Sequence, residues 1–245
     1  EDSLPMHSGA GADYGSSKAA CEQVLARACA ERAYPAVILR AAPLIGPDDP
    51  CSREVWFMKR ILENRPIVHP GPADGRLWML HVDDLIDALL RAAAAPDAVH
   101  GRAFHLACAD APTLEQHVAA LAAEMGCPAP PLQLTALSAL LAWGFRIYGF
   151  PYARAPQATP DVTAAQCALG WKARPWRSMV RLLIAGIDRS ALGLLPAWPG
   201  HATMHARLAG THEWLHDAQE RRFLQHAPCA PGAGLAALLD CLAGT

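Results

Sequence analysis

A tyrosine and a lysine stand four residues apart near the start of the sequence, in Tyr14-Gly-Ser-Ser-Lys18. On a helix, residues i and i+4 share a face, so the phenol and the ammonium come together. The positive charge favours the phenolate and lowers the tyrosine pKa from its ordinary value of about 10. We therefore predict that Tyr14 is a catalytic acid/base assisted by Lys18, in chemistry that suits hydride transfer. The alternative is a helix N-terminus with a solvated lysine.

The elements around this pair place it beside a strand. An Ala-rich helix is predicted to run to about Arg32, with Asp13 or Ser16 as its N-cap. Pro35 stops the helix, and the apolar run 36–39 predicts a parallel strand that is covered on both faces and ends at Arg40. The loop 41–47 leaves the carboxyl end of that strand, where ligands bind in open α/β sheets.

The rest of the sequence up to about residue 190 alternates between extended and helical patterns, which indicates an α/β fold. Extended segments are predicted at 67–68, 77–82 and 103–107. Helices are predicted at 53–62, 82–95, 114–125 (capped by Thr113), 134–148, 163–169 and 176–187. Beyond residue 191, frequent Pro and Gly and five histidines between His201 and His226 indicate a separate appendage, residues 191–245.

Composition excludes several classes of function. The net charge is −2 and only 18% of the 245 residues are charged, so no basic surface is expected for nucleic acid or for an anionic membrane. Eight cysteines are scattered without a C-x-x-C pair, which indicates a reduced, cytoplasmic protein. Neither a signal peptide nor a membrane-spanning stretch is predicted.

Four segments follow one another in order along the sequence: Tyr14-Gly-Ser-Ser-Lys18, Ile38-Leu39-Arg40-Ala41-Ala42-Pro43-Leu44-Ile45-Gly46-Pro47, His81-Val82-Asp83-Asp84-Leu85 and Gly101-Arg102-Ala103-Phe104-His105-Leu106-Ala107. Together they resemble the second half of an extended short-chain dehydrogenase/reductase, the NAD(P)-dependent epimerase/dehydratase family. A fainter fifth segment runs from Asp161 to Trp171. The resemblance covers about residues 1–190. It implies the C-terminal part of a Rossmann-like doubly wound parallel sheet, a small substrate-binding lobe and a helical tail.

The resemblance also implies roles for particular residues. Tyr14 would be the catalytic acid/base, and Lys18 would lower its pKa and bind the nicotinamide ribose of NAD or NADP. The backbone of Pro43, Leu44 and Ile45 would meet the nicotinamide carboxamide. We interpret the segment that contains His81, Asp83 and Asp84 as mainly structural, because helix capping explains it without a ligand. A small-molecule substrate and a homodimer formed through the Tyr14 helix are further expectations.

Two features depart from the family pattern. Nucleotide-sugar members often carry a phosphate-binding arginine four residues before the His-Val motif, where this sequence has Leu77, and Arg76 one residue earlier would face the other way in a strand. Arg76 is therefore a weak substrate-binding candidate. The apolar run from Leu137 to Phe150 could line a pocket for a less charged ligand, but we favour the interpretation that it belongs to the core.

The second departure is larger. No G-x-x-G-x-x-G turn for the cofactor pyrophosphate occurs in the sequence, and the family's catalytic Ser or Thr is also missing. We expect a C-terminal fragment, inactive alone, or a chain whose first half is supplied by a partner. The rival prediction is a non-catalytic half-domain that acts as an interaction module.

The tail carries a second enzyme motif, His212-Glu213-Trp214-Leu215-His216. On a helix this H-E-x-x-H pattern places two imidazoles where they can bind zinc, with the glutamate available to activate water. His226 or Asp240 could supply a third ligand, although neither spacing matches a known extension of the motif. A zinc metallopeptidase remains an alternative, beside adventitious metal binding and a merely His-rich appended helix, which we favour.

Overall fold

The computed structural model describes residues 12–47, 49, 53–71, 74–95, 97–145, 150–153 and 159–187, with only the helical backbone for residues 12–14. These residues form two compact units, each with its own parallel strand pair. The first unit comprises 12–43, 80–109 and 160–174, and the second comprises 44–79, 110–159 and 175–187. Both lie within the predicted body of the chain, and the boundary at residue 191 lies outside the described residues. The predicted α/β class is confirmed.

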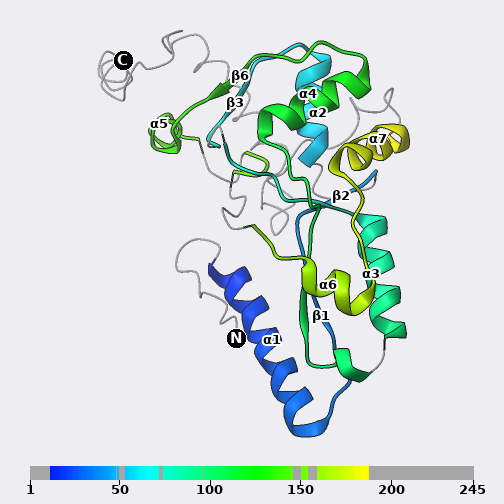
Figure 1. Cartoon of the computed structure of the whole chain (residues 1–245). Helices are drawn as coiled ribbons and strands as arrows, with labels where there is room; N and C mark the ends of the chain where they lie inside the picture. The colour runs from blue at the N-terminus through cyan, green and yellow to red at the C-terminus, as the bar shows by residue number, and fades with distance from the viewer. Residues whose placement is uncertain are drawn as a thin grey trace. The chain divides into compact units, whose positions relative to one another are not determined.

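The first unit is built on strands β1 (Ile38–Ala41) and β5 (Ala103–Leu106), which pair in parallel with Ile38 opposite Ala103 and Ala41 opposite Leu106. Helix α1 (Ala12–Arg32) lies alongside β1 (Figure 1). The unit also contains β4 (Leu80–His81), α3 (Val82–Ala94), the short 3₁₀ helix η1 (Asp97–Val99) and α6 (Thr163–Leu169), with α6 packed on β5 and α3.

A glycine turn leads into β5. Gly101 has φ +77°, and its N–H donates to the Ala36 carbonyl at 2.7 Å. A side chain there would be strained in this backbone conformation and would lie 3.4 Å from Cβ of Cys29. The turn therefore fixes where β5 meets β1.

The second unit packs three helices beside strands β3 (Ile67–His69) and β6 (Leu132–Leu134), which pair in parallel. Helix α4 (Leu114–Met125) contacts both α2 (Arg53–Leu62) and α7 (Trp176–Gly186). The Thr113 side chain accepts from the Gln116 N–H and the Gln116 side chain accepts from the Thr113 N–H, so α4 begins with a capping box. Strand β2 (Leu44–Ile45) and helix α5 (Leu137–Ala142) complete the unit.

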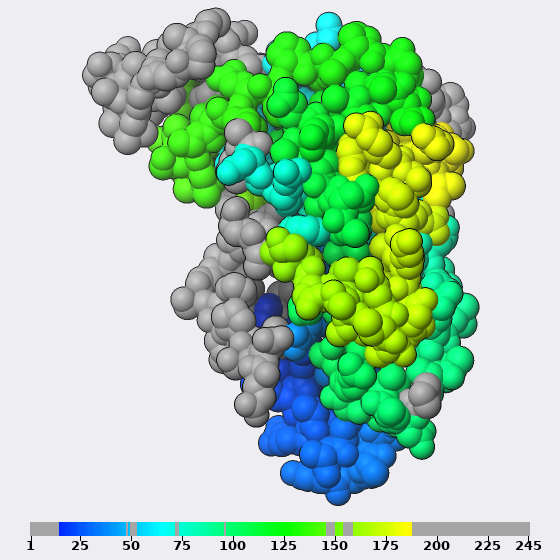
Figure 2. All heavy atoms as spheres, in the orientation of Figure 1, coloured from blue at the N-terminus to red at the C-terminus, as the bar shows by residue number. Residues whose placement is uncertain are grey.

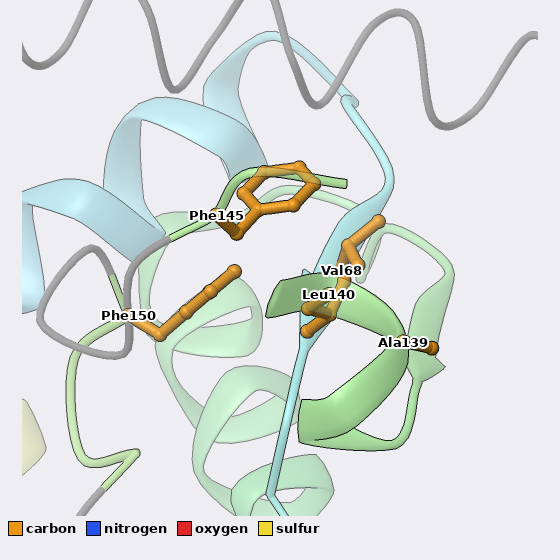
Figure 3. Close-up of a cluster of buried hydrophobic side chains, with 5 residues drawn as sticks. All are labelled: Val68, Ala139, Leu140, Phe145 and Phe150. Carbon is orange, nitrogen blue, oxygen red and sulfur yellow. The ribbon is translucent and has the colours of Figure 1, made fainter. Parts of the chain in front are cut away.

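Part of the predicted 137–150 pocket lining is core. Leu140, Phe145 and Phe150 form a buried cluster with Val68 and Ala139, and their side chains converge in Figure 3. Leu140 is fully buried and the two phenylalanines are 2% exposed. For Leu140, Phe145 and Phe150 the core interpretation is correct, whereas Leu141 is 50% exposed.

Several predicted boundaries are wrong. The helix expected over 134–148 is replaced by strand β6 and the six-residue α5, because Leu134 pairs with His69 and the backbone turns at Gly144, φ +82°, so that the Phe145 N–H bonds back to the Leu140 carbonyl. The extended segment 77–82 forms a strand only at Leu80–His81, with one isolated bridge at Arg76. Asp13 and Ser16 lie inside α1, so neither caps it.

Strand β1 also differs from its prediction. It begins at Ile38 and continues through Arg40 to Ala41, because its pairing with β5 continues to Leu106. Its residues are half-buried or exposed instead of fully covered. Among the described residues of the first unit, β5 is the neighbour to which β1 is hydrogen-bonded, so one edge of β1 has no partner strand there.

Candidate active site

Helix α1 carries the Tyr14 and Lys18 positions, as predicted. Its regular helical backbone from Ala12 to Arg32 places positions 14 and 18 one turn apart on one face. The Tyr14 side chain lies outside the described residues, and Lys18 is exposed. Of residues 15–32, only Ala19 is buried, and Figure 2 shows the end of α1 and the turn that follows it, in blue, at the surface of the first unit.

An ion pair joins α1 to β1. Arg40 Nη2 donates to Glu22 Oε2 at 2.8 Å, and Arg40 Nε lies 3.2 Å from Oε1 and 3.1 Å from Oε2. The side chains of Arg40 and Glu22 are only 18% and 21% exposed, so water screens the pair less than it screens a surface salt bridge. Charge-assisted pairs in this fork geometry are strong and directional.

Arg40 also reaches the neighbouring strand. Its Nη1 lies 3.2 Å from Nε2 of His105, and the β1–β5 register places these two residues opposite each other. The guanidinium thus joins α1, β1 and β5. No local sequence pattern predicts this three-residue cluster. The available signal was the spacing, because Glu22 follows Lys18 by four residues.

The loop that follows β1 begins in a fixed conformation. The Ala42 N–H donates to the Leu106 carbonyl at 2.8 Å, and the Pro43 carbonyl accepts from the Leu80 N–H at 3.1 Å. Pro43 is half-buried and is the last residue of the first segment of the first unit. Leu44 and Ile45 belong to the second unit, and Ile45 is 1% exposed. The Pro43 carbonyl retains one lone pair for a further donor.

The His81 segment caps and anchors α3. His81 Nδ1 accepts from the Asp83 N–H at 3.2 Å, and burial, assisted by the positive charge of Arg174, lowers the pKa of His81. The Asp84 carboxylate accepts from Arg174 Nε at 2.7 Å and from its backbone N–H at 3.2 Å, while the Asp84 carbonyl accepts from Trp171 Nε1 at 2.9 Å. These contacts agree with the structural interpretation of the motif.

Arg76 and Leu77 face different environments, as their spacing in the sequence predicted. Leu77 is 4% exposed, whereas Arg76 is exposed and its Nη1 donates to the Ala111 carbonyl at 3.3 Å. A substrate-binding role for Arg76 stays a prediction.

A buried polar cluster in the second unit was also missed. His117 Nε2 donates to Glu54 Oε2 at 2.7 Å, and the Tyr152 hydroxyl donates to Glu54 Oε1. Burial alone would raise the pKa of Glu54, but the charge and hydrogen bond of His117 and the hydrogen bond of Tyr152 give a net lowering. Burial and the Glu54 charge raise the pKa of Tyr152 well above its ordinary value. Because the residues lie 63 and 98 positions apart in the sequence, no local pattern reveals the cluster.

The predictions about a metal site and about membrane-spanning helices can be compared with the described residues only. Within the described ranges, no group of three His, Cys, Asp or Glu side chains could hold a metal ion, and no helix is both long enough and apolar enough to cross a bilayer. The motif His212-Glu213-Trp214-Leu215-His216 lies outside those ranges, as do His226 and Asp240. Within the described ranges, none of the five cysteines (Cys21, Cys29, Cys108, Cys127 and Cys167) forms a disulfide.

The family is indicated by a match that spans these elements. Residues 1–107 match the model of the NAD dependent epimerase/dehydratase family. The family resemblance is confirmed over these residues. No curated protein matches the sequence. The matched segment includes the Tyr14–Lys18 helix, strand β1 and the His81 segment.

Solved structures share the fold of the chain. UDP-glucose 4-epimerase from Thermotoga maritima, with UDP-glucose, has a TM-score of 0.55 and 20% identity, and the match covers 71% of this chain and 52% of that one. UDP-glucuronic acid 4-epimerase from Bacillus cereus, in complex with NAD, has a TM-score of 0.58 and 19% identity and covers 79% and 55%. RMD from Pseudomonas aeruginosa, complexed with NADPH, has a TM-score of 0.52 and 16% identity and covers 71% and 55%.

These structures confirm the predicted Rossmann-like α/β fold. Because these structures are only 16–20% identical in sequence to this chain, they are evidence for its fold only. The chain spans about half the length of the solved structures that it matches.

Proposed function

We propose that this chain is the C-terminal part of an NAD(P)-dependent oxidoreductase of the epimerase/dehydratase type. The observation that carries the proposal is the family match over residues 1–107, which includes both the Tyr14–Lys18 helix and the strand and loop 38–47. Similar structures named as complexes with NAD or NADPH support such a cofactor.

The residues fit the nicotinamide end of the cofactor. Lys18 is exposed on α1, where its ammonium can hydrogen-bond the ribose, and the Pro43 carbonyl can accept a further donor. A bound nicotinamide supplies ring carbon C4 as the hydride donor or acceptor.

Tyr14 performs the proton transfer in this proposal. Its phenol gives a proton to a substrate carbonyl as the carbonyl is reduced, or takes the proton of a substrate hydroxyl as the carbinol is oxidised. Lys18 stabilises the phenolate that remains. The substrate is a small molecule, and the UDP-sugars named in the similar structures are the first compounds to try, with Arg76 as a weak candidate to bind them.

We infer that the chain needs an upstream half, or a partner that supplies one, for activity. No glycine-rich turn for the pyrophosphate occurs in the sequence, and one edge of β1 lacks a partner strand among the described residues of the first unit. The exposed surface of α1 supports a homodimer formed through that helix. The scattered cysteines without a C-x-x-C pair favour a cytoplasmic location.

Cofactor titration tests the proposal. NADH and NADPH fluorescence would be followed with this chain alone and with the chain extended by its upstream sequence. We expect binding only in the extended form. Tight binding by the chain alone would contradict the need for an upstream half, and no binding by the extended form would favour the interaction module over the enzyme.

Substitution of Tyr14 tests the residue assignment. In the extended form, Tyr14→Phe should lower turnover of UDP-glucose or UDP-glucuronic acid by about 10²- to 10⁴-fold, since it removes the acid/base. Tyr34→Phe is the matched control, because Tyr34 is 53% exposed just beyond the end of the same helix. An undiminished rate in Tyr14→Phe would refute its catalytic role.

A further inference from the structure

Glu22 stands one helical turn beyond Lys18 on α1. Positions 14, 18 and 22 are spaced four apart, so Tyr14, Lys18 and Glu22 follow one face of the helix. A lysine and a glutamate at i and i+4 attract each other. A carboxylate that draws the Lys18 ammonium toward itself would weaken the stabilisation of a Tyr14 phenolate. The tyrosine–lysine pair therefore works best when Glu22 is engaged elsewhere.

Arg40 binds both carboxylate oxygens of Glu22. Its guanidinium contacts both carboxylate oxygens, with Nη2 at 2.8 Å from Oε2 and Nε at 3.2 Å from Oε1. The contact between Arg40 Nη1 and His105 on the paired strand keeps the guanidinium in place at 3.2 Å. Both side chains of the ion pair are about four-fifths buried, so the pair persists at physiological salt.

We propose that Arg40 is a positioning residue for the Tyr14–Lys18 pair: it holds Glu22 against β1, which fixes α1 on the strand and leaves the Lys18 ammonium to Tyr14. The inference deepens the proposed function and rests on it. Arg40 acts through Glu22 and touches no reacting atom.

Two further titratable groups surround this cluster. His105 on β5 faces Arg40, and Asp161 in turn interacts electrostatically with His105. Hydrogen bonds from Thr163, together with that interaction, lower the pKa of Asp161. Histidine and aspartate ordinarily complete their titration below about pH 8, so a tyrosine titration at higher pH leaves both in one state.

The test is a titration of Tyr14 in the full chain. The four tyrosines would be labelled with ¹³C at the ζ carbon and followed by NMR from about pH 8 to about pH 11.5, and the Tyr14 signal assigned from Tyr14→Phe. Arg40→Gln should move the titration midpoint of Tyr14 up by about one pH unit, because the released Glu22 now attracts Lys18. The exposed Tyr34 is the internal reference and should not move.

A second variant separates this effect from a loosened helix. Glu22→Gln breaks the same ion pair but leaves no carboxylate beside Lys18, so the Tyr14 midpoint should not rise. The double variant Glu22→Gln/Arg40→Gln should have the wild-type Tyr14 midpoint. Arg40→Lys should keep the Tyr14 midpoint close to the wild-type value, because a lysine still pairs with Glu22. Glu31→Gln, at an exposed position of the same helix, is the matched control. Equal shifts in Arg40→Gln and Glu22→Gln, or no shift in Arg40→Gln, would overturn the inference.

NADH titration of the extended chain keeps the two proposals apart. If NADH does not bind but Arg40→Gln shifts Tyr14, the proposed function fails while the control of the pair by Arg40 stands. If NADH binds and Arg40→Gln leaves Tyr14 unshifted, the inference about Arg40 alone is overturned.

Discussion

His69 in the second unit should make the chain lose stability in mild acid. The side chain is 1% exposed at the end of β3, and both ring nitrogens are used. Nε2 donates to the Pro151 carbonyl at 2.6 Å, and Nδ1 accepts from the Gly71 N–H at 2.9 Å. A second proton on the ring would displace the Gly71 N–H. Burial lowers the pKa of His69 from 6.5 to about 4, against the opposing effect of the Pro151 hydrogen bond.

The sign of the effect follows from proton binding. Since the folded pKa lies below the unfolded value, the unfolded chain binds a proton more readily at every pH between them. The contribution of neutral His69 is fully present above pH 6.5 and is lost as the pH falls toward about 4. At about 1.4 kcal/mol per pH unit, the interval corresponds to about 3 kcal/mol of unfolding free energy.

Urea unfolding, monitored by tryptophan fluorescence between about pH 7.5 and about pH 4.5, measures this loss. His69→Gln should be less stable at neutral pH but should lose about 2.5 kcal/mol less than the wild type over this pH range, because the neutral amide does not titrate. His100→Gln is the control, since the His100 side chain in the first unit is 31% exposed. The same loss in wild type and His69→Gln would refute the reasoning.

Three further predictions concern the second unit and the tail. Tyr152→Phe should lower the unfolding free energy by about 1.5–3 kcal/mol in urea unfolding, because it removes a donor from the buried Glu54 carboxylate, and no loss would show that the hydroxyl is dispensable. Leu140→Ala should lower the unfolding free energy by about 2–5 kcal/mol, whereas Leu141→Ala, at a half-exposed neighbour, should lower it by less than about 1 kcal/mol. Equal losses in the two variants would contradict the core shown in Figure 3. The chelator-washed chain should retain no stoichiometric zinc by metal analysis, and tightly held zinc that depends on residues 212–216 would revive the peptidase alternative.

Helices with strong local signals were predicted to the residue. Arg53–Leu62 and Thr163–Leu169 have the predicted bounds, and Thr113 caps α4 as expected. Periodicity and capping act within one or two turns, so the sequence alone displays them. The parallel pairing of β1 with β5 also agrees with the predicted fold class.

Errors arose where distant backbone decides the structure. Leu134 was expected to be helical, but it pairs with His69, more than sixty residues away. Arg40 was expected at the end of a strand, but β1 continues to Ala41 because β5 offers a partner as far as Leu106. Strand pairing depends on which segments fold together, and local propensity does not specify that choice.

The candidate site shows the same division between local and distant information. The Tyr14–Lys18 pair can be predicted from the sequence, because a single helix sets the relation between residues i and i+4. The ion pair between Arg40 and Glu22 depends on how α1 packs against β1, and the position of His105 opposite Arg40 depends on the strand register. A search for a catalytic pair should therefore also examine the next turn of its helix: an acid there either competes for the lysine or, as with Glu22, is held by a cation from another element.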